Sequence, residues 1–105
     1  MAKPTPKGYW IANSDISDLD GVWLYRDANR EVMTHYGAKF LVMHGQQQVP
    51  EGTSRSSQTL VEFPSYQAAV DCYNHPDYQK AAELRQRVAV SSMVIVEGYI
   101  GPQDF

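Results

Sequence analysis

Short apolar segments alternate with longer segments of helical periodicity in this sequence, and their order leaves few possible folds. Runs rich in β-branched and aromatic residues predict four strands, at residues 9–13, 40–43, 59–63 and 93–96. Apolar residues spaced three, four or seven apart predict a helix over residues 19–36. Ser65 begins a second helical segment, which Pro76 should break before it resumes. The predicted order is therefore β-α-β-β-α-β.

This order favours an α+β, ferredoxin-like fold, in which two helices cover one face of a four-stranded antiparallel sheet. The fourth strand should lie beside the first, followed by the third and the second. A length of 105 residues fits one domain. We expect that domain at residues 8–100, between a flexible arm at 1–7 and a tail at 101–105.

The second and fourth predicted strands are apolar at successive positions, so they are apolar on both faces. Phe40–Met43 and Met93–Val96 lack the polar alternation of a sheet with one solvated face. Two helices on one side leave the other face uncovered. A second copy of the chain is the simplest cover, and the result would be a homodimeric α+β barrel.

Several short motifs, in order, resemble one bacterial family, known as domain of unknown function 1330. They are Lys7-Gly8-Tyr9-Trp10-Ile11-Ala12, Tyr36-Gly37-Ala38-Lys39-Phe40-Leu41, Val61-Glu62-Phe63-Pro64-Ser65-Tyr66, Ala68-Ala69, His75-Pro76-Asp77-Tyr78-Gln79, Leu84-Arg85 and Val94-Ile95-Val96-Glu97-Gly98. The resemblance spans about residues 7–99 and implies a dimeric α+β barrel without an assigned activity. Met43-His44-Gly45 departs from the family pattern, which commonly has an arginine followed by two glycines there.

Composition and charge argue against several classes of protein. A net charge of −3 without a clustered basic face disfavours nucleic-acid binding. No apolar run approaches the roughly 20 residues that span a bilayer, and residues 1–7 do not resemble a signal peptide. The single cysteine, Cys72, excludes an intramolecular disulfide. We therefore expect a cytoplasmic protein that binds neither nucleic acid nor membranes.

Neither a metal site nor a cofactor is expected. The histidines are His35, His44 and His75, and no two of them share a spacing typical of metal ligands. The glycines form no phosphate-binding loop. Cys72 lies in the middle of a predicted helix, where a buried structural role is favoured over a catalytic one.

Two glutamates are candidates for proton transfer because each ends an apolar strand. A desolvated carboxyl at Glu62 or Glu97 would have a raised pKa. Taking their strands as antiparallel to each other, we expect them at opposite ends of the sheet, with Glu62 near Asn13 and Glu97 near Tyr9. The alternative is that both are solvent-edge or dimer-interface residues.

The favoured candidate site lies at the predicted end of the sheet that holds Tyr9 and Glu97. His44 and Arg85 are expected there as well. His44 is the first choice for a general base with Glu97, because its unperturbed pKa lies near neutrality. Tyr9 and Arg85 would bind ligand, and Arg85 suits an anionic group.

The rival ligand site is the opposite end of the sheet, with Glu62 and Asn13. Tyrosines on the predicted helices would line a cleft between helices and sheet, or simply complete the core. The function expected from these features is small-molecule binding by a homodimer. The alternatives are a cofactor-independent enzyme with monooxygenase- or isomerase-like acid/base chemistry and a purely structural or interaction module.

Overall fold

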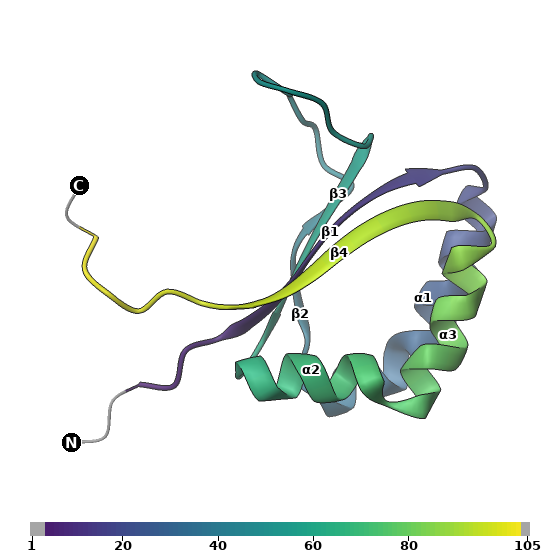
Figure 1. The fold of residues 1–105 in the computed structure, drawn as a ribbon. Coiled ribbons are helices and arrows are strands. Elements are labelled where there is room, and N and C mark those ends of the chain that lie inside the picture. The colour runs from purple at the N-terminus through teal and green to yellow at the C-terminus, as the bar shows by residue number, and fades with distance from the viewer. Residues whose placement is uncertain (1–3, 104–105) are drawn as a thin grey trace.

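The computed structural model describes residues 4–103, which form one antiparallel sheet and three helices (Figure 1). The elements are β1 (Gly8–Ile16), α1 (Leu19–His35), β2 (Lys39–Met43), β3 (Ser57–Phe63), α2 (Tyr66–Asn74), α3 (Pro76–Gln86) and β4 (Ala89–Glu97). The strand order is β2-β3-β1-β4. The predicted ferredoxin-like fold and its strand order are therefore confirmed.

The second predicted helix is two helices, α2 and α3, that meet at an angle (Figure 1). His75 has extended backbone with φ −66° and ψ 134°, because the ring of Pro76 excludes helical geometry from the preceding residue. Its Nδ1 atom accepts a hydrogen bond from the backbone N–H of Asp77 at 3.1 Å. Pro76 then begins α3, where its missing N–H costs nothing.

The core forms where the helices pack on one face of the sheet. Trp10 of β1 is its centre: the Nε1–H donates to the carbonyl of Ala69 at 2.9 Å, which fixes α2 against the sheet. The Trp10 ring lies 4.8 Å, centroid to centroid, from Phe63 of β3 and from Tyr78 of α3. One buried aromatic residue thus joins the sheet to two helices.

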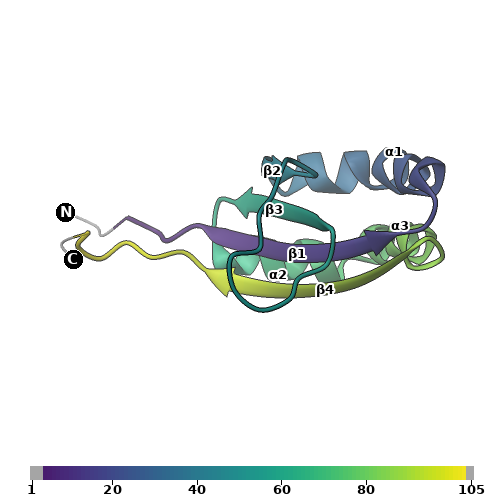
Figure 2. The ribbon, with the colours of Figure 1, turned by 90° about the horizontal axis from the view of Figure 1, so that it is seen from above.

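The face of the sheet away from the helices carries an apolar row that crosses all four strands. Ile11 pairs with Leu60 and with Val94, and Leu60 pairs with Val42. Ile11 is 44% exposed and Val94 57% exposed, so their side chains are not covered within the chain. The loop between β2 and β3 rises on this same side, in front of β1 and β4 when the molecule is seen from above (Figure 2).

Within residues 4–103, no helix has the length and apolar character needed to cross a membrane.

Candidate functional site

A cavity of about 70 Å³ lies between the helices and the sheet. Its wall comes from all four strands or their ends and from two helices: Trp10, Ala12, Ser14, Ile16, Val22, Tyr25, Arg26, His44, Thr59, Val61, Tyr78, Arg85, Ala89, Ser91 and Met93. The strand positions alternate, as expected for residues on one face of a sheet. The expected cleft between sheet and helices is therefore present as a small cavity.

Helical spacing explains which side chains of α1 and α3 reach the wall. Val22, Tyr25 and Arg26 are three and four residues apart, so they share one face of α1. Tyr78 and Arg85 are two turns apart on α3. Arg26 was not among the predicted site residues, although its spacing of four from Val22 indicates that it borders the inward-facing stripe of α1.

Two tyrosines place hydroxyl groups beside each other on the wall. The oxygens of Tyr25 and Tyr78 are 2.7 Å apart, within hydrogen-bonding distance. Tyr78 is 1% exposed, and burial raises the pKa of its hydroxyl well above the usual value. The Tyr78 hydroxyl is therefore neutral at physiological pH and offers the cavity a hydrogen-bonding group.

Two arginines line the same cavity with their guanidinium faces against aromatic rings. The Cζ atom of Arg26 lies 4.5 Å from the centroid of Phe40, and Arg26 also donates to the Sδ atom of Met43. The Cζ atom of Arg85 lies 5.6 Å from the centroid of Tyr25. Such cation–π contacts use the flat faces of the guanidinium groups and leave donors at their edges.

His44 follows β2 and lines the cavity on an open side, since its side chain is exposed in the single chain. Its φ of 53° is in the left-handed region, which is uncommon for a residue with a Cβ. Its Nδ1 atom contacts the hydroxyl of Ser57, and its backbone N–H donates to the carbonyl of Gln58 at 2.9 Å. Partial burial and the positive charge of Arg26 lower the pKa of His44, so the imidazole is neutral at pH 7.

The structure brings His44 together with Arg85 but not with Tyr9 and Glu97. β1 and β2 are both antiparallel to β3, so the end of β2 lies with the end of β1. Tyr9 is at the start of β1, and Glu97 pairs with the neighbouring residue Gly8. The expected grouping of His44 with these two residues is wrong, because β2 runs parallel to β1 and not in the opposite direction.

The expected positions of Glu62 are wrong for a related reason. β3 and β4 flank β1 and are both antiparallel to it, so they run parallel to each other and end at the same side of the sheet. Glu62 therefore lies at the end that holds Glu97, opposite Tyr9. The Tyr9 hydroxyl donates to Oε2 of Glu62 at 3.0 Å, and this hydrogen bond raises the pKa of Tyr9.

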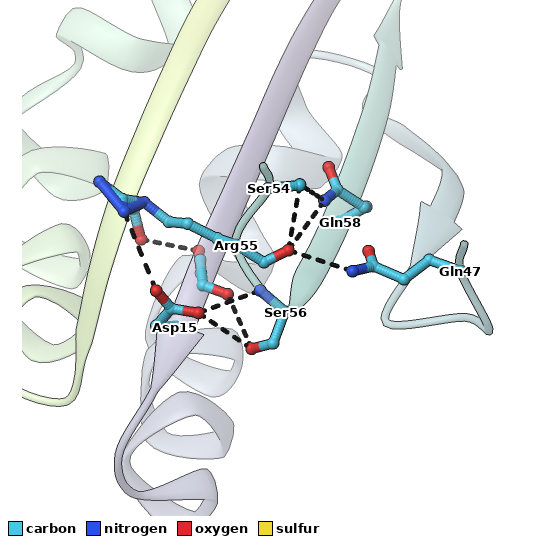
Figure 3. A network of polar contacts seen from close by, with 8 residues as sticks. Asp15, Gln47, Ser54, Arg55, Ser56 and Gln58 are labelled. Atoms are coloured by element: carbon cyan, nitrogen blue, oxygen red, sulfur yellow. Dashed lines mark hydrogen bonds and ion pairs between the residues drawn. The ribbon is translucent and has the colours of Figure 1, made fainter. Parts of the chain in front are cut away.

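Asn13 is far from Glu62, because it pairs with Gln58 near the other end of β3. It borders a surface hollow that Asp15 and Arg55 also line. Figure 3 shows the neighbouring network, in which the Asp15 carboxylate accepts hydrogen bonds from the N–H and the hydroxyl of Ser56 at 3.0 and 3.1 Å. These bonds lower the pKa of Asp15 and anchor the β2–β3 loop to the end of β1.

No group of three or more His, Cys, Asp or Glu side chains in the described part of the chain is arranged to hold a metal ion. Cys72 is fully buried, and burial raises the pKa of its thiol to about 12. A thiol with this pKa is not a nucleophile at neutral pH. Its sulfur lies 3.7 Å from the Sδ atom of Met33, as expected for a packing residue.

Nearly the whole chain matches one known protein family. Residues 7–99 match the family model described as Domain of unknown function (DUF1330). The chain belongs to the DUF1330 family. The resemblance noted from the sequence motifs is thereby confirmed. No curated protein sequence matches the chain.

Solved structures with the same fold have low sequence identity to this DUF1330 protein. A protein of unknown function from Rhodopseudomonas palustris is 16% identical with a TM-score of 0.72, over 91% of this chain and 85% of that one. SnoaB, a cofactor-independent oxygenase from Streptomyces nogalater, is 6% identical with a TM-score of 0.64, over 95% of this chain and 100% of that one. A dimeric ferredoxin-like protein of unknown function from Thermobifida fusca is 12% identical with a TM-score of 0.58, over 92% and 95%. At these identities the likeness establishes the fold alone.

Proposed function

We propose that this DUF1330 protein is a homodimer that binds a small molecule in the cavity between its sheet and helices. The observation that carries the proposal is the composition of the cavity wall. Apolar side chains such as Trp10, Val61 and Met93 make up most of it, and a few polar groups are added from separate elements. Concave, mostly apolar sites with a small number of placed polar groups are typical of ligand pockets.

The homodimer would use the other face of the sheet, so it would leave the cavity intact. The row Val42, Leu60, Ile11 and Val94 offers a second copy a continuous apolar strip. Tyr9, Glu62 and Asn13 have the same parity on their strands as members of this row, so we place them at the polar rim of the interface rather than in the ligand site. The ferredoxin-like relative from Thermobifida fusca, which is described as dimeric, supports this assembly.

A cavity-filling variant tests the binding function. Ala12 lines the cavity, so Ala12→Leu should reduce its volume and abolish binding of small-fragment hits found by ligand-observed NMR on the wild-type protein. Ala28→Leu is the matched control, because Ala28 is exposed on α1 and does not line the cavity. Failure to find any fragment that binds the wild type, or equal binding by Ala12→Leu, would contradict the proposal. A purely structural or interaction module predicts equal binding of fragments by the wild type and Ala12→Leu.

A second candidate function, a cofactor-independent enzyme, is favoured by one observation at the same cavity. The neutral His44 imidazole on its wall can accept a proton from a bound molecule. The fold shared with the oxygenase SnoaB is consistent with such chemistry. Glu97 lies at the far end of the sheet, so it would not act with His44 within one subunit. Turnover that is lost in His44→Gln while ligand binding persists would distinguish the enzyme from a binding protein.

A further inference from the structure

The charged side chains on the cavity wall are all basic or potentially basic. Arg26 comes from α1, Arg85 from α3, and His44 follows β2, while no Asp or Glu of the described residues lines the cavity. The whole chain nevertheless has a net charge of −3. The basic character of the wall is therefore local, and it comes from three separate elements.

Neither cavity arginine forms an ion pair with any side chain of residues 4–103. Two arginines outside the cavity do: Arg30 lies 2.8 Å from a carboxylate oxygen of Asp27, and Arg55 lies 3.9 Å from one of Asp15, whereas Arg87 is exposed to solvent. Arg26 and Arg85 are instead held on the rings of Phe40 and Tyr25 and are partly buried. Holding partly desolvated guanidinium groups without a carboxylate is unfavourable, unless an anion completes their hydrogen bonding.

The rest of the wall limits the size of that anion. The cavity volume of about 70 Å³ is about half that of an engineered cavity of about 150 Å³ that holds benzene. Trp10, Val22 and Val61 give it an apolar interior. Scaling from the six carbons of benzene, an apolar group of about three carbons suits this space.

We propose that the cavity binds a small organic carboxylate, whose carboxylate group is held by Arg26 and Arg85 and whose short apolar part lies against Trp10. The inference rests on the proposed binding function and names its ligand class. The guanidinium groups supply paired N–H donors that match the geometry of a carboxylate. In this arrangement the neutral His44 imidazole, which can accept a proton, lies nearer the carboxylate of the ligand than its apolar part.

Binding should also change the titration of His44. Partial burial and, second, the charge of Arg26 lower its pKa, and the Ser57 hydroxyl contacts its Nδ1 atom. A carboxylate bound to Arg26 would offset that charge, so the pKa of His44 should rise when the ligand is added. The ring C–H resonances of His44 report this shift without any catalytic turnover.

The test is an NMR titration with butanoate, its neutral analogue butanamide, and inorganic phosphate. Butanoate should bind at least about tenfold more tightly than butanamide, since hydrogen bonds to charged groups carry that much discrimination. Arg26→Met and Arg85→Met should each weaken butanoate binding by about tenfold or more. Arg30→Met and Arg87→Met are the matched controls on the same helices or their ends, and both should bind like the wild type. Thermal melts establish that every variant is folded.

The outcomes separate the ligand class from the binding function. Equal binding of butanamide and butanoate, phosphate binding as tight as butanoate, or equal losses in the Arg30 and Arg87 controls would each overturn the carboxylate proposal. If other fragments still bound and were excluded by Ala12→Leu, the proposed binding function would stand. If no small molecule bound at all, both would fail.

Discussion

Replacing Val94 by lysine should dissociate the proposed homodimer. Val94 lies on β4, at one end of the apolar row that crosses the face of the sheet away from the helices. Its side chain is 57% exposed in the single chain, so the monomer tolerates a charge there while a face-to-face dimer would bury it. A twofold assembly places the substitution in the interface twice.

The magnitude follows from that exposed fraction. Complete burial of a valine side chain contributes about 1.5–3 kcal/mol, and the exposed share of Val94 therefore corresponds to about 2–3 kcal/mol for the two copies in a dimer. Desolvating two unpaired ammonium groups costs several kcal/mol more. A total of about 6 kcal/mol raises the dissociation constant by about 10⁴-fold.

The assay is size-exclusion chromatography with light scattering at micromolar concentration. The wild type should have about twice the chain mass of 11.9 kDa, and Val94→Lys should have the mass of one chain with an unchanged circular dichroism spectrum. Leu24→Lys is the matched control, because Leu24 is 60% exposed on α1, away from the sheet. A monomeric wild type would exclude the proposed homodimer, and a Val94→Lys protein that remained a dimer would exclude this face of the sheet as the interface.

Two further substitutions test local features of the fold. Gly8→Ala should lower the free energy of unfolding by about 1–3 kcal/mol in a denaturant titration, because the new Cβ would overlap the carbonyl oxygen of Ser65 and lie 2.6 Å from Cα of Tyr66. Gly45→Ala is the control, because a Cβ there would meet no atom within 4 Å. Similar losses of stability in both variants would contradict this packing. The lowered pKa of His44 means that the unfolded chain binds its proton more readily, so wild-type stability should fall as pH drops from about 7 through the folded pKa. His44→Gly should remove that pH dependence, and it should raise the free energy of unfolding at pH 7 by about 1 kcal/mol because glycine adopts a positive φ without strain. Thermal melts of both proteins at pH 5 and 7 measure these effects. A wild type that is more stable at pH 5 than at pH 7 would contradict the prediction.

The parts of the fold that depend on local pattern were predictable from the sequence. Apolar runs and helical spacing were sufficient to give the element order, and Pro76 marked the break between α2 and α3 because its ring restricts His75 directly. The uncovered face followed from the apolar residues at both parities of Phe40–Met43. These signals lie within a few residues of the structure they specify.

The site was less predictable because it depends on the relative directions of strands that are distant in sequence. The correct strand order implies that β3 and β4 run parallel, yet the directions assigned from the sequence placed Glu62 and Glu97 apart and His44 with Tyr9. The arrangement of Arg26 over Phe40 depends on the packing of α1 beside β2, which no local pattern reports. The sequence was thus sufficient to select candidate residues but not to predict which of them lie close together in the structure.

Methionine methyl NMR reports directly on ligand binding in this cavity. Met93 lines the cavity, whereas Met33 is buried in the core beside Cys72, so their methyl signals distinguish the two regions. Saturable ligand-induced shifts of Met93, with Met33 unchanged and the effect absent in Ala12→Leu, are the predicted result. A Met93 signal that no small molecule moves, while surface resonances respond, would show that ligands do not bind in the cavity.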